Sequence, residues 1–247
     1  MNERHNRILG ILTRDNRTSV NELAQELSVS SVTIRQDLTL LEREGLLKRV
    51  HGGAILRGAD DITSRLGINY ERKILIARKA ASLIEDGETI FIESGSVNAL
   101  LAKELAARTS ITVVTTNVFI ARQLRKSKGA KVILMGGLYQ PESESLVGAL
   151  TKACIEAVNF GKAFIGIDGF SLEAGLTSRD MMRAEIAAEI VRRARTSYIL
   201  TDSSKFGRSE LSTICPVESV NCLITDGEIP REHRGFLESK GVEVVVV

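Results

Sequence analysis

Polar and basic side chains in the first quarter of the sequence have the chemistry that contacts nucleic acid. Arginine suits guanine or phosphate, glutamine suits adenine, and serine or threonine suits either. Side chains of these types recur between apolar residues over positions 31–39, and two cations and a histidine follow at 48–51. The candidate DNA-binding residues are Ser31, Thr33, Arg35, Gln36, Thr39, Lys48, Arg49 and His51.

The charge balance agrees with this placement without proving it. The chain of 247 residues carries 33 Lys and Arg against 31 Asp and Glu. Residues 1–57 hold nine of the basic and seven of the acidic residues, so the whole excess lies there. A net charge of +2 is equally typical of a solvated surface. The segment could also be a protein-interaction module, with Arg35 paired to Asp37 or Glu42.

A second group of polar residues stands where apolar stretches end. These residues are Glu93–Ser96, Thr115–Asn117, Gly136-Gly137, Gly166–Gly169 and Thr201–Lys205. In parallel sheets, ligands bind outside the carboxyl ends of the strands. Gly95 and Ser96 at a strand-to-helix turn offer backbone N–H groups that suit a phosphate, and Lys205 offers a positive charge. Alternatively, glycine and serine are ordinary turn residues, Asp168 is a cap, and Lys205 lies on the surface.

The elements that would position the first group are three helices and a hairpin. Apolar residues recur at helical spacing over about 3–15, 20–27 and 32–41, and Gly45 suits a helix C-terminus. Val32, Ile34, Leu38 and Leu41 are expected to face inward on the third helix. Short strands at 46–50 and 54–56 flank the turn at 51–53. This order predicts a winged helix-turn-helix domain over residues 1–57.

The second group requires a different architecture. Residues 58–69 are polar and contain glycine, which suits a linker. From residue 70 onward, helices and apolar strands alternate. Helices are expected near 70–84, 97–107, 118–127, 151–158 and 180–195, and strands at 89–93, 112–116, 131–135, 162–168, 197–201, 222–225 and 242–247. The predicted fold class is therefore α/β, with a mainly parallel sheet over residues 70–247.

Composition limits the remaining possibilities. The apolar content of 43% excludes bulk disorder, and no apolar run approaches the roughly 20 residues that cross a bilayer. The first residues, MNERHNRIL, do not resemble a secretory signal, and the three cysteines lack the spacing of a metal site or a disulfide scaffold. A cytoplasmic protein without a metal or redox cofactor is expected.

Longer motifs identify a family. The pattern SxxTIRxDLxxLExxGxLxRxHGGA, over residues 30–54, resembles the DNA-binding domain of the DeoR family of bacterial transcriptional regulators. Arg65 and the segments ERKILIARKAA, ESGS, FIGIDG and LTDSSKFG are similar to the effector domain of that family. The resemblance implies a helix-turn-helix over 20–39 and a recognition helix over 31–44. It also implies a sugar-responsive domain similar to ribose-5-phosphate isomerase and to the CoA-transferase-like fold.

The resemblance implies a sugar-phosphate site with two departures. The candidate effector-binding residues are Ser94, Gly95, Ser96, Asn98, Asp168 and Lys205. Val97 stands in the phosphate turn where many family members have a hydroxyl, whereas Asn98 can donate a hydrogen bond. Ile165 stands where the isomerases have a carboxylate, so the groups for proton transfer are incomplete. Binding without turnover is expected.

These observations predict a DNA-binding transcriptional regulator, a repressor of carbohydrate-metabolism genes, controlled by a phosphorylated sugar or related metabolite. The alternatives are a sugar-phosphate isomerase-like enzyme with an accessory domain and a scaffold protein. Ile165 disfavours the enzyme, and the outward Thr33, Arg35 and Gln36 disfavour the scaffold. Because one winged helix reads few base pairs, operator DNA is expected to bind a homo-oligomer, a dimer or a tetramer.

Overall fold

The computed structural model describes residues 3–15, 17–43, 46–55, 61–107 and 110–247. The chain forms two compact units, Met1–Tyr70 and Glu71–Val247. No helix among the described residues is long and apolar enough to span a membrane.

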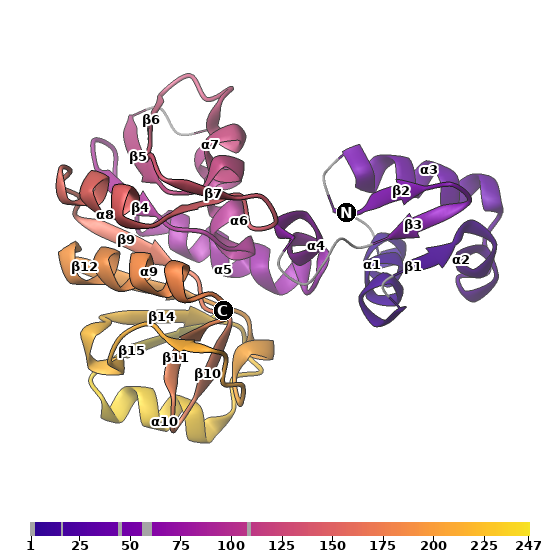
Figure 1. Ribbon diagram of the computed structural model, residues 1–247. Helices are drawn as coiled ribbons and strands as arrows, with labels where there is room; N and C mark the ends of the chain where they lie inside the picture. The colour runs from indigo at the N-terminus through magenta and orange to yellow at the C-terminus, as the bar shows by residue number, and fades with distance from the viewer. Residues whose placement is uncertain (1–2, 16, 44–45, 56–60, 108–109) are drawn as a thin grey trace. The chain divides into compact units, whose positions relative to one another are not determined.

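The first unit is a winged helix (Figure 1). Its elements are α1 (Glu3–Asp15), β1 (Arg17–Ser19), α2 (Val20–Glu26), α3 (Ser31–Arg43), β2 (Lys48–Val50) and β3 (Gly53–Ile55). The strands pair antiparallel in the order β1-β3-β2. Ile8, Leu12, Leu23, Ile34 and Leu38 are fully buried between the helices. The expected helices and hairpin are confirmed, whereas β1 was not expected, and Gly45 lies outside the described residues.

Local signals explain where α2 begins and ends. Ser19 and Glu22 form a capping box, in which each side chain accepts a hydrogen bond from the other residue's backbone N–H. The Ser19 hydrogen bonds lower the pKa of Glu22. After α2, Ser28 adopts a left-handed conformation with φ of 54°, and the Val29 N–H returns to the Ala24 carbonyl. This tight turn lets α3 start only five residues after α2 ends.

The expected linker is partly helical. Helix α4 (Ile62–Gly67) begins at Asp61, whose side chain accepts a hydrogen bond from the Ser64 N–H. Ile62 and Leu66 are buried. Residues 56–60 lie outside the described part of the chain.

The second unit is built on a seven-stranded parallel sheet in the order β15-β14-β12-β9-β4-β5-β6. Its strands are β4 (Thr89–Ile92), β5 (Ile111–Thr115), β6 (Ala130–Leu134), β9 (Lys162–Ile165), β12 (Thr196–Leu200), β14 (Cys222–Thr225) and β15 (Glu243–Val246). All seven were expected, and each ladder is parallel. The predicted α/β class is confirmed.

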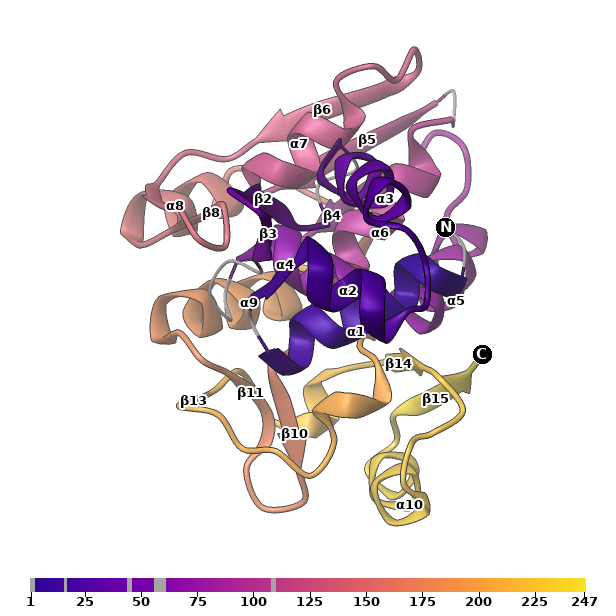
Figure 2. The same ribbon diagram turned by 90° about the vertical axis from the view of Figure 1, so that its right-hand side faces the viewer.

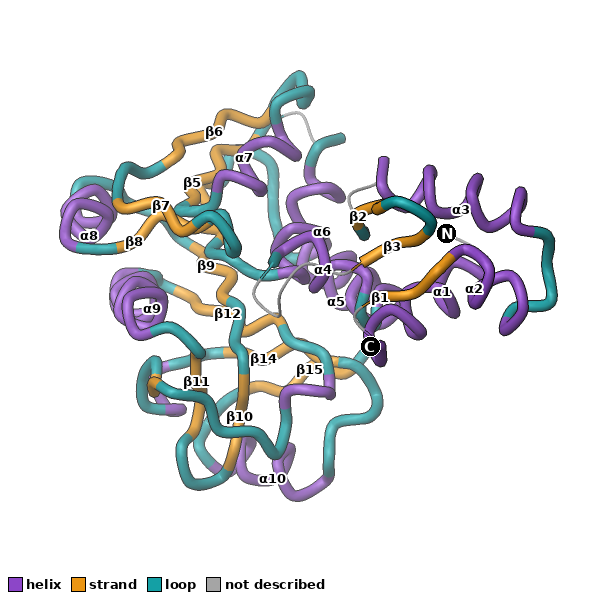
Figure 3. Tube along the Cα trace, turned by 45° about the vertical axis from the view of Figure 1, so that its right-hand side comes forward, coloured by secondary structure: helices purple, strands orange, loops and turns teal. Residues whose placement is uncertain are grey.

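Helices cover this sheet. They are α5 (Tyr70–Ser82), α6 (Ser96–Leu105), α7 (Val118–Leu124), α8 (Ala149–Glu156), α9 (Met181–Arg193) and α10 (Arg231–Ser239). Figure 3 shows α8 and α9 on one side of the central strands and α5 and α6 on the other. The central strands are largely apolar because both of their faces are covered, whereas Ile133 and Leu134 on the edge strand β6 are 41% and 43% exposed. Phe91, Phe164 and Ile199 are fully buried.

Smaller strands were not expected from the sequence. β7 (Leu138–Gln140) pairs with β8 (Ser145–Val147), and β10 (Gly169–Ser171), β11 (Gly175–Ser178) and β13 (Ser212–Thr213) form a second antiparallel sheet. Figure 2 shows this second sheet below α9. Its first strand, β10, begins directly after Asp168, one of the expected effector residues.

Candidate nucleic-acid interface and effector site

The exposed face of α3 carries most of the candidate DNA-binding residues. A shallow depression on it is lined by Val32, Arg35, Gln36, Thr39, Leu40 and Arg43. Arg35, Gln36 and Thr39 are exposed, whereas Ser31 and Thr33 are half-buried. The structure therefore brings Arg35, Gln36 and Thr39 together on one stripe of the helix.

The expectation that Val32 faces inward is wrong. Its side chain is 59% exposed, whereas Ile34, Leu38 and Leu41 are fully buried. At about 100° per residue, position 32 lies some 200° from position 34, on the opposite side of the helix. The fourth buried residue of α3, beside Ile34, Leu38 and Leu41, is instead Asp37, which lies one turn after Ile34.

Several candidate residues also hold α3 in place. The Ser30 hydroxyl accepts a hydrogen bond from the Thr33 N–H at 3.1 Å and lies 2.9 Å from the Thr33 hydroxyl. The Thr39 hydroxyl donates to the Arg35 carbonyl at 2.7 Å and accepts from Arg49 Nη1 at 2.8 Å. Ser30 therefore fixes the first turn of the helix, and Arg49 ties β2 to its middle.

The three candidate residues of the wing differ in their exposure to solvent. Lys48 and His51 are exposed, whereas Arg49 is half-buried against α3. The Arg49 N–H also donates to Glu42 Oε1 at 2.7 Å. Arg49 is thus anchored to the recognition helix rather than projecting freely from the hairpin.

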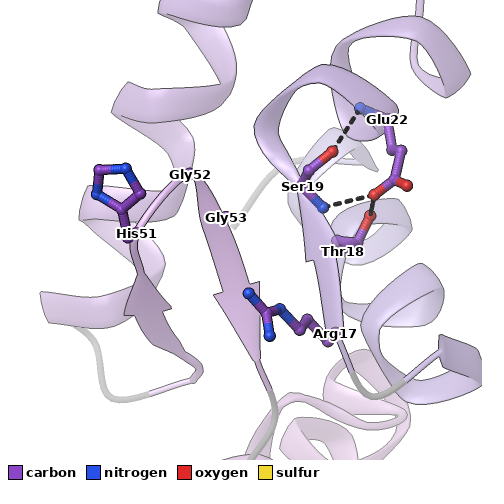
Figure 4. Close-up of a pocket in the computed structure, with 7 residues that line it drawn as sticks. All are labelled: Arg17, Thr18, Ser19, Glu22, His51, Gly52 and Gly53. Atoms are coloured by element: carbon purple, nitrogen blue, oxygen red, sulfur yellow. Dashed lines mark hydrogen bonds between the residues drawn. The ribbon is translucent and has the colours of Figure 1, made fainter.

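A polar pocket beside the wing was not expected from the sequence. Arg17, Thr18, Ser19, Glu22, His51, Gly52 and Gly53 line a hollow of about 310 Å³ (Figure 4). A Cβ atom on Gly53 would lie 2.2 Å from the Thr18 carbonyl oxygen, so only glycine lets β1 and β3 approach here. In Figure 4, His51 projects away from the Ser19–Glu22 pair. Arg17 is exposed and adds a cation that the periodicity did not reveal.

Asp37 is a second residue whose role was not expected. It is 6% exposed and accepts two hydrogen bonds from Arg4, at 2.6 and 3.0 Å. His5 Nε2 lies 3.0 Å from the same carboxylate. Burial raises the pKa of Asp37, but the bonds and charges of Arg4 and His5 outweigh it, so the pKa lies below its ordinary value. The recognition helix is therefore locked to α1, and Arg35 does not take Asp37 as a partner.

Four of the six candidate effector residues lie in the buried turn after β4 and in the first turn of α6. Ser94, Gly95, Ser96 and Asn98 are all buried. Gly95 is the N-cap of α6, with φ of 121° and no side-chain hydrogen bond to the helix. A residue with a side chain is strained at this φ, and with glycine there the first turn of α6 is open in the sense that no side chain caps its N–H groups.

Asn98 holds this turn against β9. Its amide nitrogen donates to the carbonyls of Ser94 at 2.9 Å and Phe164 at 3.1 Å. The amide oxygen, Oδ1, is also buried, but it has no hydrogen-bond partner among the described residues. A buried acceptor without a partner marks a place where a ligand or a water donates.

Buried charges surround the turn. The Gly166 N–H donates to Glu93 Oε2 at 3.2 Å, and the Ser94 hydroxyl donates to Glu93 Oε1. Burial raises the pKa of Glu93, although Ser94, Gly166 and the charge of Arg183 each lower it. The other two candidates, Asp168 and Lys205, follow β9 and β12.

Asp168 is engaged by neighbouring groups. Its Oδ2 atom accepts from the Arg179 N–H at 3.1 Å and lies 3.7 Å from Arg183 Nη2. Lys205 is half-buried in the turn η1 (Ser203–Lys205), two strands away from β4 in the sheet order. Among the described residues, no three His, Cys, Asp or Glu side chains gather as they would around a metal ion.

A winged helix joined to a parallel α/β domain defines a two-domain, DNA-binding transcriptional regulator. A model of the DeoR-like helix-turn-helix domain matches residues 4–58, and a model of the DeoR C terminal sensor domain matches residues 68–227. The chain therefore belongs to the DeoR family, and the expected family is confirmed.

Relatives extend along the whole chain. The HTH-type transcriptional regulator GolR of Listeria innocua is 33% identical over 99% of this chain and 98% of its own length. The lactose phosphotransferase system repressor of Lactococcus lactis is 33% identical over 92% of this chain and 91% of its own length. Among solved structures, ribose 5-phosphate isomerase A of Methanocaldococcus jannaschii gives a TM-score of 0.42 at 18% identity, covering 56% of this chain and 55% of that chain.

Proposed function

We propose that this regulator represses carbohydrate genes and is controlled by a phosphorylated sugar at the carboxyl ends of β4, β9 and β12. The observation that carries the proposal is the open first turn of α6 beside the buried, unpartnered Asn98 Oδ1. Backbone N–H groups at a helix N-terminus suit a phosphate, and a sugar hydroxyl would supply the donor that Asn98 Oδ1 lacks. The lactose repressor named above supports the carbohydrate assignment.

The DNA-binding role is assigned to α3 and the wing. Arg35 and Gln36 would read base edges, with Ser31, Thr33 and Thr39 beside them. Lys48, Arg49 and His51 would contact the backbone. Effector binding would favour an arrangement of the DNA-binding units with lower operator affinity, by linkage. Since one recognition helix reads few base pairs, the functional form would be a cytoplasmic dimer or tetramer.

Two measurements test this function together. An operator is selected from random duplexes with the full chain, and its affinity is measured at fixed salt. Glucose 6-phosphate, fructose 6-phosphate, ribose 5-phosphate and the corresponding free sugars are then added one at a time. At least one phosphosugar should raise the melting temperature and weaken operator binding, whereas its free sugar should not. A regulator indifferent to every phosphosugar would overturn the effector assignment and leave DNA binding intact.

We further propose that the site binds without turnover. Ile165 is fully buried in β9 and cannot transfer a proton, and Asp168 is held by Arg183 and the Arg179 N–H. A general base must reach the proton that it removes. Ribose 5-phosphate should therefore isomerise no faster with the protein than in buffer. An enzymatic rate in the parent that disappears in Asp168→Asn would contradict this expectation.

A further inference from the structure

Val32 is an exposed apolar side chain at one end of a depression whose other lining residues are Leu40 and four polar or basic side chains. It is the second residue of α3, is 59% exposed, and lines the same depression as Arg35 and Gln36. Positions 35 and 36 are its i+3 and i+4 neighbours, so all three side chains lie on one stripe. Valine is also a weaker helix former than alanine, and Val32 adds nothing to the buried core.

The surroundings of Val32 fit DNA better than protein. Arg35 and Arg43 line the same depression, and the described acidic residue nearest in sequence, Asp37, points inward to Arg4 and His5. The lining of the depression thus contains two cations and no carboxylate, as a surface for phosphates requires. In the major groove, thymine alone presents an apolar group, its 5-methyl, and an aliphatic side chain recognises it by contact.

We propose that Val32 is a specificity-determining residue that packs against the 5-methyl group of one thymine in each operator half-site. The adjoining bases would be those that Arg35 and Gln36 contact. The hydrogen-bonding residues of α3 cannot supply this discrimination, because deoxyuridine presents the same polar atoms as thymidine.

The test removes one methyl group at a time. In the selected operator, each thymidine is replaced by deoxyuridine, and affinity for the full chain is measured at fixed salt. The parent should lose about fourfold at one thymine per half-site, the factor expected for one buried methyl group. Val32→Ala should bind the thymidine operator more weakly by a similar factor, with no further loss on the deoxyuridine operator.

Two controls make this result specific. Leu40→Ala alters another apolar residue of the same depression and should keep the parent's sensitivity to that deoxyuridine. Selection of operators with Val32→Ala should relax the preference for thymine at that position alone. The proposal is overturned if no thymine is sensitive in the parent, or if Val32→Ala remains as sensitive as the parent.

A second inference concerns the first turn of α5. Arg72 Nη1 donates to the Ser203 hydroxyl at 3.1 Å and to Glu228 Oε2 at 2.5 Å, and it lies 3.9 Å from Asp226 Oδ1. Lys73 Nζ lies 3.8 Å from Asp202 Oδ2, with side-chain exposures of 4% and 2%. The helix that directly follows the DNA-binding unit in the chain is thus tied to the loops after β12 and β14.

These loops also contain Lys205. Asp202 caps η1 by accepting the Ser204 N–H at 3.2 Å, and Asp226 accepts the Ser203 N–H at 2.7 Å. Buried charges such as Lys73 and Asp202 are costly to separate, so the turn and the helix are constrained to move together. We infer that Arg72 and Lys73 are positioning residues that transmit effector binding at η1 to α5. This inference rests on the effector site proposed above.

Charge reversal at Arg72 and Glu228, the exposed pair among these contacts, tests the inference. The Arg72 and Glu228 side chains are 38% and 66% exposed, so their replacement spares the core. Arg72→Glu and Glu228→Arg should each bind operator and phosphosugar within about twofold of the parent. Each should reduce by about fivefold or more the factor by which the active phosphosugar weakens operator binding. The double reversal should restore that factor.

The outcomes separate the two assignments. A parent that responds to no phosphosugar removes both the effector site and this inference. A parent that responds, with single reversals that respond equally, overturns the inference alone. A loss that the double reversal does not restore also overturns it, since it would reflect general damage.

Discussion

Asp37→Ala is expected to destabilise the DNA-binding unit by about 1.5–3 kcal/mol, the range for hydrogen bonds to charged groups, because Asp37 and His5 are buried but Arg4 is about one third exposed. Arg4 and His5 would lose the carboxylate that joins α1 to α3. A unit of this size has only about 3–5 kcal/mol of stability from its core. A larger fraction of the unit should therefore be unfolded at 37 °C, and operator affinity should fall because only the folded form binds.

Urea denaturation of the full chain, followed by circular dichroism, measures this effect. Asp86→Ala removes an exposed carboxylate from the other unit and should unfold as the parent does. Since the folded pKa of Asp37 lies below its unfolded value, its contribution is present above the unfolded pKa of about 3.8 and is lost as the pH falls. The difference between parent and variant should therefore shrink below about pH 4. Equal midpoints at pH 7 would refute the role of Asp37.

The recognition helix shows what periodicity can and cannot predict. Ile34, Leu38 and Leu41 follow the helical repeat and are buried as expected. Val32 is apolar but out of phase, so hydrophobicity alone placed it wrongly. Asp37 is in phase but charged, and its burial depends on Arg4, which lies 33 residues away in sequence. A pairing over that distance is set by the packing of α1 against α3.

In the effector domain, too, some elements could be predicted from the sequence and others could not. Its seven parallel strands are largely apolar runs, which sequence reveals directly. β10, β11 and β13 consist largely of glycine, serine and threonine, and α10 has only Phe236 and Leu237 as large apolar residues. The three strands have no strong alternation of apolar and polar residues, and α10 is short and mostly polar. Within the site, Gly95 and Ser96 could be predicted because they are typical turn residues. The buried hydrogen bond from Asn98 to the Phe164 carbonyl could not, because it depends on β9 being the neighbour of β4 in the sheet.

Lys205→Ala is expected to separate effector response from DNA binding. If Lys205 supplies the positive charge to the phosphate, its loss should weaken phosphosugar binding at least about tenfold, as for a hydrogen bond to a charged group. Operator affinity without effector should stay at the parent value, because the DNA-binding unit is unchanged. By reciprocity, a ligand that binds weakly cannot release the operator at ordinary concentrations. In cells, the variant should repress its target in the presence and absence of inducer.

Gly95→Ala tests the same site from its other side. The new Cβ atom would meet only the Gly166 Cα at 3.6 Å, but φ of 121° strains any side chain by about 1–3 kcal/mol. If the turn shifts to relieve that strain, the N–H groups of α6 lose their alignment, so phosphosugar affinity should fall with little change in operator affinity. Lys128→Ala, which removes an exposed cation elsewhere in the domain, should respond as the parent does. Reporter repression with and without inducer, backed by thermal shifts with the active phosphosugar, measures all three variants. A normal response from Lys205→Ala would place the anion on other groups, and a normal response from both site variants would remove the phosphate from this turn.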